Sequence, residues 1–170
     1  MAQGVVLTFD PKADGQVRDL WAKLDAAGLP TERKFPPHLT LAMATDIPAR
    51  TRAALKSDLR MLAVPNIGLE ALSTFSSTEN VLMLAAVTDG ELLAVHSAVH
   101  DVLAGRVRNP SAYYLPGAWM AHCTLAQGVT REQMVAGFDA LFPVTPIRVR
   151  ARQIAVLDTT NDEIDVLVDL

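Results

Sequence analysis

Two short motifs of the same residue types carry the side chains best suited to chemistry. His38-Leu39-Thr40 and His122-Cys123-Thr124 both have the pattern His-x-Thr, and each is followed by Leu-Ala. Residues two apart in a strand point to the same face, so each motif presents an imidazole and a hydroxyl together. The middle residue of each motif points to the opposite face, which we expect to be buried. Because Cys123 is the middle residue of its motif, we expect its thiol to be buried and inert.

Two imidazoles beside one phosphorus atom could cleave a phosphodiester. The reaction needs one group that takes a proton from the attacking oxygen and another that gives a proton to the leaving oxygen. Histidine, with an ordinary pKa of about 6.5, can do either, and two facing rings favour one neutral and one protonated form. Thr40 and Thr124 could hydrogen-bond the phosphate oxygens. These groups suffice for the reaction, so we expect no metal and no other cofactor.

The two motifs occupy matching positions in a repeat, with the histidines 84 residues apart in a chain of 170. Two similar units usually pack about a pseudo-two-fold axis, which would bring both histidines into one central groove. The alternative is that each histidine only satisfies backbone groups at a strand edge and that the match reflects the repeat. The other matching segments are Val5–Phe9 with Val81–Val87, Asp14-Gly15 with Asp89-Gly90, Gly28 with Gly105, and Ile67–Phe75 with Ile147–Leu157.

Hydrophobic periodicity predicts the elements that position the motifs. Asp10 and Gly28 are expected to begin and end the first helix, and Thr130 with Gln133 has capping-box spacing. The predicted strands cover residues 5–9, 38–43, 67–75, 81–87, 119–126, 147–157 and 164–170, and the predicted helices cover 11–27, 47–62, 89–104 and 130–142.

Composition limits the class of protein and its partners. Half of the residues are apolar, a fifth are charged, and the net charge is −4. A basic field is expected of a protein that tracks long nucleic acid, so a small nucleotide or a short RNA end is favoured and DNA is not expected. No apolar run approaches the roughly 20 residues of a membrane span, and no secretory signal is visible. With a single cysteine, these features indicate a cytoplasmic protein. The oligomeric state stays open.

Two loops that lead into the motifs carry basic and aromatic side chains. Such residues at a groove rim could pair with phosphate or stack on a base, although a solvated loop with packed aromatics is an equally good interpretation of each one. The candidate substrate-binding residues are Arg33, Lys34 and Phe35 before the first motif and Tyr113, Tyr114 and Trp119 before the second.

His96 and His100 have the i, i+4 spacing of some helical metal sites. No third ligand is apparent, and the predicted buried stripe lies beside them, so we expect a surface or boundary position for both. Trp21 lies on the buried stripe of the first helix and is expected in the core.

The motifs Pro36-Pro37-His38-Leu39-Thr40-Leu41 and His122-Cys123-Thr124-Leu125 closely resemble those of the 2H phosphoesterase superfamily, the LigT-like or 2′-5′ RNA ligase group. The resemblance covers essentially the whole chain. It implies an α+β, bilobal, pseudo-two-fold fold in which two antiparallel sheets flank a central groove, with helices outside. It also implies that His38 and His122 are the catalytic acid and base and that Thr40 and Thr124 bind phosphate.

One departure concerns an arginine that many members of the RNA-ligase branch carry shortly after the motif. Met43 and Gln127 occupy those positions here. The missing arginines weaken the interpretation as an RNA ligase and leave the two-histidine chemistry intact.

The sequence therefore predicts a single domain over residues 1–170, built from lobes of about 1–80 and 81–170, with strand exchange between the lobes left open. The predicted function is a metal-independent phosphodiesterase that acts on a 2′,3′-cyclic or 2′-5′ ribose phosphodiester in an RNA end or a small nucleotide. The alternatives are a binding module of the same fold, a reversible 2′-5′ RNA ligase, and a metal protein built around His96 and His100. Which histidine is the base, and whether the product is a 2′- or 3′-phosphate, stay open.

Overall fold

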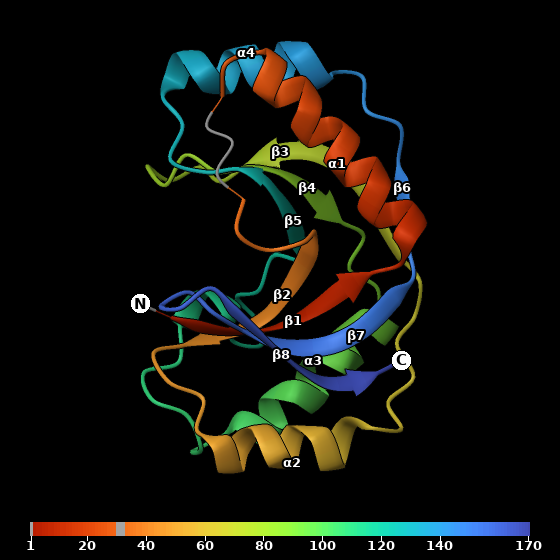
Figure 1. The fold of residues 1–170 in the computed structure, drawn as a ribbon, viewed down its shortest axis with the longest axis vertical. Coiled ribbons are helices and arrows are strands. Elements are labelled where there is room, and N and C mark those ends of the chain that lie inside the picture. The colour runs from red at the N-terminus through yellow and green to blue at the C-terminus, as the bar shows by residue number, and fades with distance from the viewer. Residues whose placement is uncertain (1, 30–32) are drawn as a thin grey trace.

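Two antiparallel sheets form the centre of the molecule in the computed structural model, which describes residues 2–29 and 33–170 (Figure 1). One has the order β2-β1-β7-β8 and the other β5-β4-β3-β6. The predicted α+β fold with two antiparallel sheets is confirmed. The first sheet is made of β1 (Gln3–Phe9), β2 (His38–Ala44), β7 (Ala151–Asp158) and β8 (Glu163–Asp169), and the second of β3 (Ile67–Thr74), β4 (Leu82–Ala86), β5 (His122–Ala126) and β6 (Ile147–Val149).

Helices cover the outer faces of both sheets (Figure 1). Helices α1 (Pro11–Ala26) and α4 (Arg131–Leu141) pack together over the second sheet. Helices α2 (Ala49–Leu59) and α3 (Gly90–Leu103) pack together over the first. The inner faces, where the motif strands lie, are left toward the middle of the molecule. No helix of the described residues is long and apolar enough to cross a membrane.

Each sheet combines strands from both halves of the chain, because β3 joins the second sheet while β7 and β8 join the first. The single strand predicted over residues 147–157 is therefore wrong. It divides at Arg150 into β6 and β7, which belong to different sheets. Asp10 holds this crossing point: its amide donates to the Arg150 carbonyl (2.9 Å), and its carboxylate accepts from the Arg150 amide (2.7 Å).

The helix ends follow local rules. Asp10 caps α1 by accepting from the Ala13 amide, and the predicted capping box of Thr130 and Gln133 is present at the start of α4. The predicted match of Asp14-Gly15 to Asp89-Gly90 is wrong, because Asp89 is the N-cap of α3 while Asp14 lies inside the first turn of α1. The residue equivalent to Asp89 is Asp10.

The motif strands bury one face in the main core. The side chains between and after the motif residues on that face, Leu39, Leu41, Cys123 and Leu125, are all buried there. A second, smaller apolar cluster forms on the inner face of the first sheet from Val6, Ala155 and Leu157, with Phe35 packed against it. The strand predicted to begin at Trp119 begins instead at His122, so Trp119 lies in the preceding loop.

Candidate active site

The two motif strands lie side by side in the middle of the molecule. Strands β2 and β5 are edge strands of different sheets and contact each other (Figure 1). The Cys123 thiol interacts with the backbone of His38 across this contact, and burial raises the pKa of that thiol to about 12. The structure thus places the two His-x-Thr motifs next to each other and leaves Cys123 protonated and buried, as expected.

The two histidines are held in the same way. Nδ1 of His38 lies 2.8 Å from the carbonyl oxygen of Pro36, and Nδ1 of His122 lies 2.7 Å from that of Met120. A carbonyl can only accept a hydrogen bond, so each Nδ1 carries a proton and donates it. Each ring therefore keeps Nε2 as the atom that can take or give a proton. The partner lies two residues before the histidine in both cases, so this arrangement repeats with the motif.

Both imidazoles have a lowered pKa. Burial lowers the pKa of His38 most, the Pro36 carbonyl opposes this in part, and the nearby imidazole of His122 lowers it further. Burial also lowers the pKa of His122, with the Met120 carbonyl acting in the opposite direction. The electrostatic influence of His122 on His38 indicates that the two rings interact. Protonation of one then disfavours protonation of the other.

A cavity of about 520 Å³ opens beside the motifs. His38, Thr40 and Thr124 all contribute to its wall, so three of the four groups predicted to share one groove line this cavity, and His122 is not among the lining residues. His122 lies next to this wall, with its ring edge-on to Phe75 at a centroid distance of 5.2 Å. The cavity is of the size that holds a small organic ligand.

Most of the predicted rim residues reach the cavity. Arg33, Lys34, Phe35 and Tyr114 line it, and burial raises the pKa of Tyr114, with a smaller contribution from the Glu79 carboxylate. Tyr113 lies outside the lining and is 75% exposed.

Trp119 lies outside the cavity lining and contacts the motif strand instead. Its indole N–H donates to the Thr40 carbonyl (3.0 Å), and its ring stacks on His96 at a centroid distance of 4.0 Å. His100 donates from Nε2 to the Leu41 carbonyl (3.0 Å). These three rings therefore supply hydrogen bonds and packing along the free edge of β2.

The surface or boundary position predicted for His96 is wrong, because its side chain is buried. Its Nε2 lies 2.8 Å from the Tyr114 carbonyl, which requires that Nε2 donate. Burial lowers the pKa of His96 and the neighbouring His100 lowers it further. In both rings Nε2 is thus engaged by a backbone carbonyl, and no group of three His, Cys, Asp or Glu in the described ranges could hold a metal ion.

A β-bulge follows each motif at the same place. Strand pairing skips Leu41 in β2 and Leu125 in β5, each three residues after the motif histidine. The extra residue shifts the alternation of side chains beyond it. As a result Met43 and Gln127, the two positions without arginine, line the cavity with Thr40 and Thr124. Met43 extends over Gly4, where a Cβ atom would lie only 2.6 Å from the methionine sulfur.

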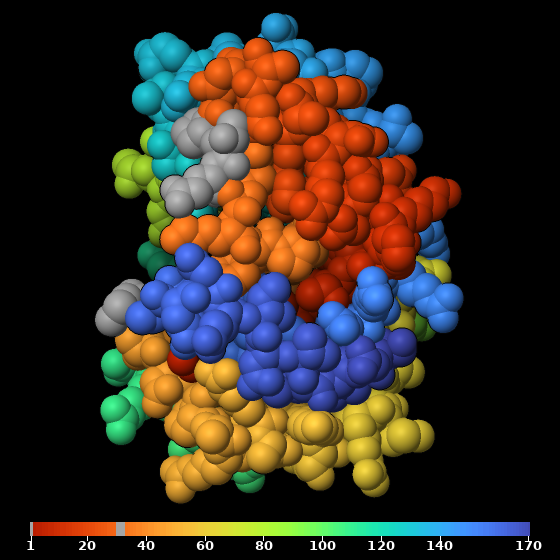
Figure 2. Space-filling model, in the orientation of Figure 1, coloured from red at the N-terminus to blue at the C-terminus, as the bar shows by residue number. Residues whose placement is uncertain are grey.

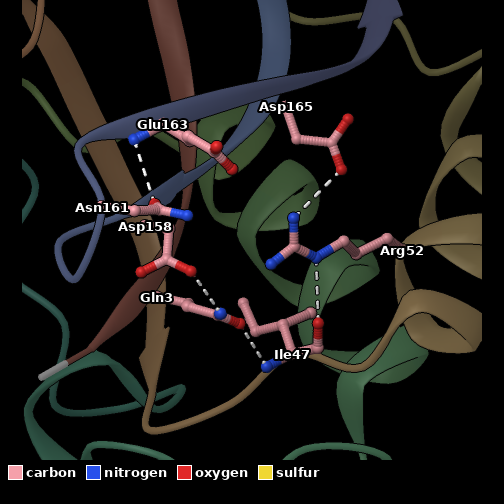
Figure 3. Close-up of polar contacts among 7 residues, drawn as sticks. All are labelled: Gln3, Ile47, Arg52, Asp158, Asn161, Glu163 and Asp165. Carbon is pink, nitrogen blue, oxygen red and sulfur yellow. Dashed lines mark hydrogen bonds and ion pairs between the residues drawn. The ribbon is translucent and has the colours of Figure 1, made fainter.

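The turn between β7 and β8 supplies two further wall residues that sequence reasoning missed, Thr159 and Asp162. Figure 3 shows how this region is held: the Gln3 side chain donates to the Asp158 carboxylate (2.7 Å) and accepts from the Ile47 amide (2.7 Å). The Thr160 amide and Gln3 lower the pKa of Asp158. No local pattern in the sequence marks this turn as part of the site.

Comparison with known proteins identifies the family to which the chain belongs. The sequence model of the 2′-5′ RNA ligase superfamily matches residues 5–163. The chain belongs to this superfamily. Its members are 2H phosphoesterases, so the predicted resemblance is confirmed and the activity is of the phosphodiesterase or ligase type. A search of curated proteins found no match.

Solved structures share the fold of this superfamily member. A structure described as a phosphoesterase matches with a TM-score of 0.57 at 14% identity, over 99% of this chain and 94% of that one. The PDE domain of MHV ns2 matches with a TM-score of 0.55 at 18% identity, over 75% and 78%. Usb1 of Kluyveromyces marxianus with uridine monophosphate matches with a TM-score of 0.54 at 12% identity, over 99% and 98%. At these identities the likeness shows the fold.

Proposed function

We propose that this protein is a metal-independent phosphodiesterase that uses His38 and His122 as acid and base on a 2′,3′-cyclic or 2′-5′ ribose phosphodiester. The observation that carries the proposal is the matched orientation of the two rings. In both motifs Nδ1 donates to the carbonyl two residues earlier, which fixes the tautomer and leaves Nε2 as the reactive atom. The alternative, in which each histidine only satisfies a backbone carbonyl, does not account for the position of His38, Thr40 and Thr124 on the wall of one cavity.

The reaction follows from these groups. With the phosphorus between the two rings, the neutral histidine takes the proton of an attacking water at Nε2 while the water oxygen bonds to phosphorus. One ribose oxygen leaves as its bond to phosphorus breaks, and the protonated histidine gives it a proton. The hydroxyls of Thr40 and Thr124, both on the cavity wall, hydrogen-bond the non-bridging phosphate oxygens and hold the phosphorus in line.

Relatives support a nucleotide substrate. The MHV ns2 structure is described as a PDE domain, and the Usb1 structure contains uridine monophosphate. The aromatic rings of Phe35 and Tyr114 on the cavity wall offer surfaces on which a nucleobase could stack. We therefore expect a nucleotide or an RNA 2′,3′-cyclic phosphate end in this cavity.

Reversible 2′-5′ RNA ligation is the second candidate, favoured by the superfamily to which the chain belongs. The same acid and base would serve the reverse reaction, with a ribose hydroxyl in place of water. Neutral Met43 and Gln127 on the cavity wall provide no cation to hold a second RNA strand end, so hydrolysis is the better-supported direction.

The decisive assay is turnover of a nucleoside 2′,3′-cyclic phosphate in the presence of EDTA. Turnover that survives chelation and is lost in both His38→Ala and His122→Ala supports the proposal. Tight binding of the nucleotide without turnover would identify a binding module instead. A requirement for added metal would contradict the mechanism.

A further inference from the structure

We propose that this site binds its substrate as a single nucleotide, with one phosphate held at the motifs and no second phosphate bound. The inference deepens the proposed phosphodiesterase function and rests on it. The substrate class is a nucleoside 2′,3′-cyclic phosphate, free or as the last residue of an RNA whose neighbouring nucleotides add little to binding. Three features of the cavity support it: its charge, the rim that carries its acidic residue, and its apolar floor.

The first feature is the charge of the wall. The charged lining residues among those described are Arg33, Lys34 and Asp162. Arg33 already forms an ion pair with Asp25 (2.7 Å). Its guanidinium carbon lies 4.9 Å from the centroid of the Trp21 ring. Lys34 pairs with Asp162 itself (3.1 Å). Apart from the one imidazole that the proposed mechanism protonates, the formal charge of the wall is therefore +1, enough for one phosphate monoanion and not for a polyanion.

The second feature is the rim that carries Asp162. In Figure 2 the turn between β7 and β8 lies directly against the segment that precedes β2, where Lys34 stands. Two hydrogen bonds hold the turn internally, from the Thr160 amide to the Asp158 carboxylate (2.8 Å) and from the Glu163 amide to the Asn161 side chain (3.2 Å). A third joins it to the residue before β1, from the Thr159 hydroxyl to the Ala2 carbonyl (2.7 Å). A rim built this way keeps an acidic group at the cavity, where it repels additional phosphates.

The third feature is the floor. Val6 and Leu157 form an apolar base with Phe35 packed against it, and all three line the cavity. Such a surface suits a planar base and gives nothing to a phosphate. The positions where the motif bulges aim side chains into the cavity hold Met43 and Gln127, which are neutral. The floor therefore offers apolar contact to one nucleoside rather than a track for a phosphate backbone.

The experiment compares kcat/KM for a nucleoside 2′,3′-cyclic phosphate with that for a hexanucleotide RNA carrying the same cyclic end. We expect the two values to agree within about threefold. We also expect log kcat/KM for the hexamer to fall with log salt at a slope near −0.7, the value for about one phosphate contact on a single strand. A hexamer preferred by tenfold or more, or a slope of −2 or steeper, would overturn the inference while the phosphodiesterase function stood. Absence of turnover on both substrates would overturn both proposals.

Charge variants sharpen the comparison. Asp162→Asn and Gln127→Arg each make the wall more positive by one charge, and each should raise the hexamer-to-mononucleotide ratio of kcat/KM about fivefold, as expected for one charge near a surface. Asp58→Asn and Ala53→Arg make the same charge changes at exposed positions of α2 and should leave the ratio unchanged. Equal ratios in all five proteins would contradict the role assigned to the wall charge.

Discussion

The two motif strands share their inner geometry and differ at their free edges. Along β2, the Thr40 carbonyl accepts from the Trp119 indole and the Leu41 carbonyl accepts from the His100 imidazole. The Met43 carbonyl accepts from the Ser111 amide. All three donors belong to the second half of the chain. Along β5 the Leu125 carbonyl accepts from Arg33 at 3.4 Å.

Unpaired edge groups in a buried position lower stability, so the rings from α3 and the following loop hold the first motif in place. The difference teaches that pseudo-symmetry is kept at the two His-x-Thr motifs and is relaxed in the structure that supports them.

The strongest test of the shared geometry is to remove each histidine in turn. His38→Ala and His122→Ala should each lower kcat by about 10²- to 10⁴-fold, because each removes one partner of the acid–base pair. The double variant should be little worse than either single one, since the two groups act together. Single-turnover kinetics on a cyclic nucleotide measure this, with circular dichroism to check folding. A loss below tenfold in one variant alone would break the proposed equivalence of the two motifs.

The threonines provide a second test of the same equivalence. Thr40→Val and Thr124→Val keep the shape of the side chain and remove the hydroxyl that we propose binds phosphate. Each should lower kcat by about 10²-fold, the scale for loss of one donor to a charged transition state. The matched control is Thr145→Val, which changes an exposed residue outside the cavity lining. Unequal effects of the two motif variants would show that the phosphate is hydrogen-bonded mainly by the threonine of one motif.

The fold and the motif residues were predictable because they follow from local patterns. Alternation in strands assigned His38 and Thr40 to one face and Leu39 to the other, and the repeat predicted that two such strands would meet. The crossing at Arg150 was not predictable, since apolar and basic residues alternate through it without a glycine or proline and the break depends on Asp10, 140 residues away. Propensity carries no information on such distant pairing.

The edge support of β2 was hidden from the sequence for the same reason. Trp119 was a candidate for substrate stacking because aromatic residues are scarce and it precedes the motif. Its actual partners, His96 and the Thr40 carbonyl, are set by tertiary packing. The i, i+4 pair of His96 and His100 similarly resembled half of a metal site, while both rings donate to backbone carbonyls. Residue type indicated that these side chains matter, and only the fold could indicate what they contact.

The hydrogen bonds along the free edge of β2, which distinguish it from β5, can be tested at Trp119. Trp119→Phe retains a ring to stack on His96 and removes the donor to the Thr40 carbonyl, so a partly buried acceptor loses its partner. We expect the free energy of unfolding to fall by about 1–3 kcal/mol, measured by urea denaturation. kcat should fall about threefold to tenfold with KM nearly unchanged, because Thr40 shifts relative to the other motif. Tyr113→Phe, at an exposed residue of the same loop, is the control. An unchanged stability would mean that the indole contact contributes nothing to the edge.

The pH dependence of the rate is the smallest of these effects, and it depends on the protonation of both motif histidines. In the proposed mechanism the active form of the free enzyme has one protonated and one neutral imidazole, and its population is largest between the two pKa values of the coupled pair. Burial lowers the pKa of both His38 and His122 from the ordinary 6.5, and their mutual repulsion lowers that of His38 further. The maximum of kcat/KM should therefore lie on the acid side of pH 6.5, with activity falling toward higher pH as the remaining imidazolium loses its proton.

A bound phosphate anion stabilises that imidazolium, so the profile of kcat should lie at higher pH than the profile of kcat/KM. Initial rates across pH 4.5–8.5 at constant ionic strength measure both profiles. Activity that rises steadily above pH 7 would assign the proton transfers to some other group. Agreement of the two profiles would mean that the phosphate lies too far from the protonated ring to influence it, which contradicts the placement of phosphorus between the two motifs.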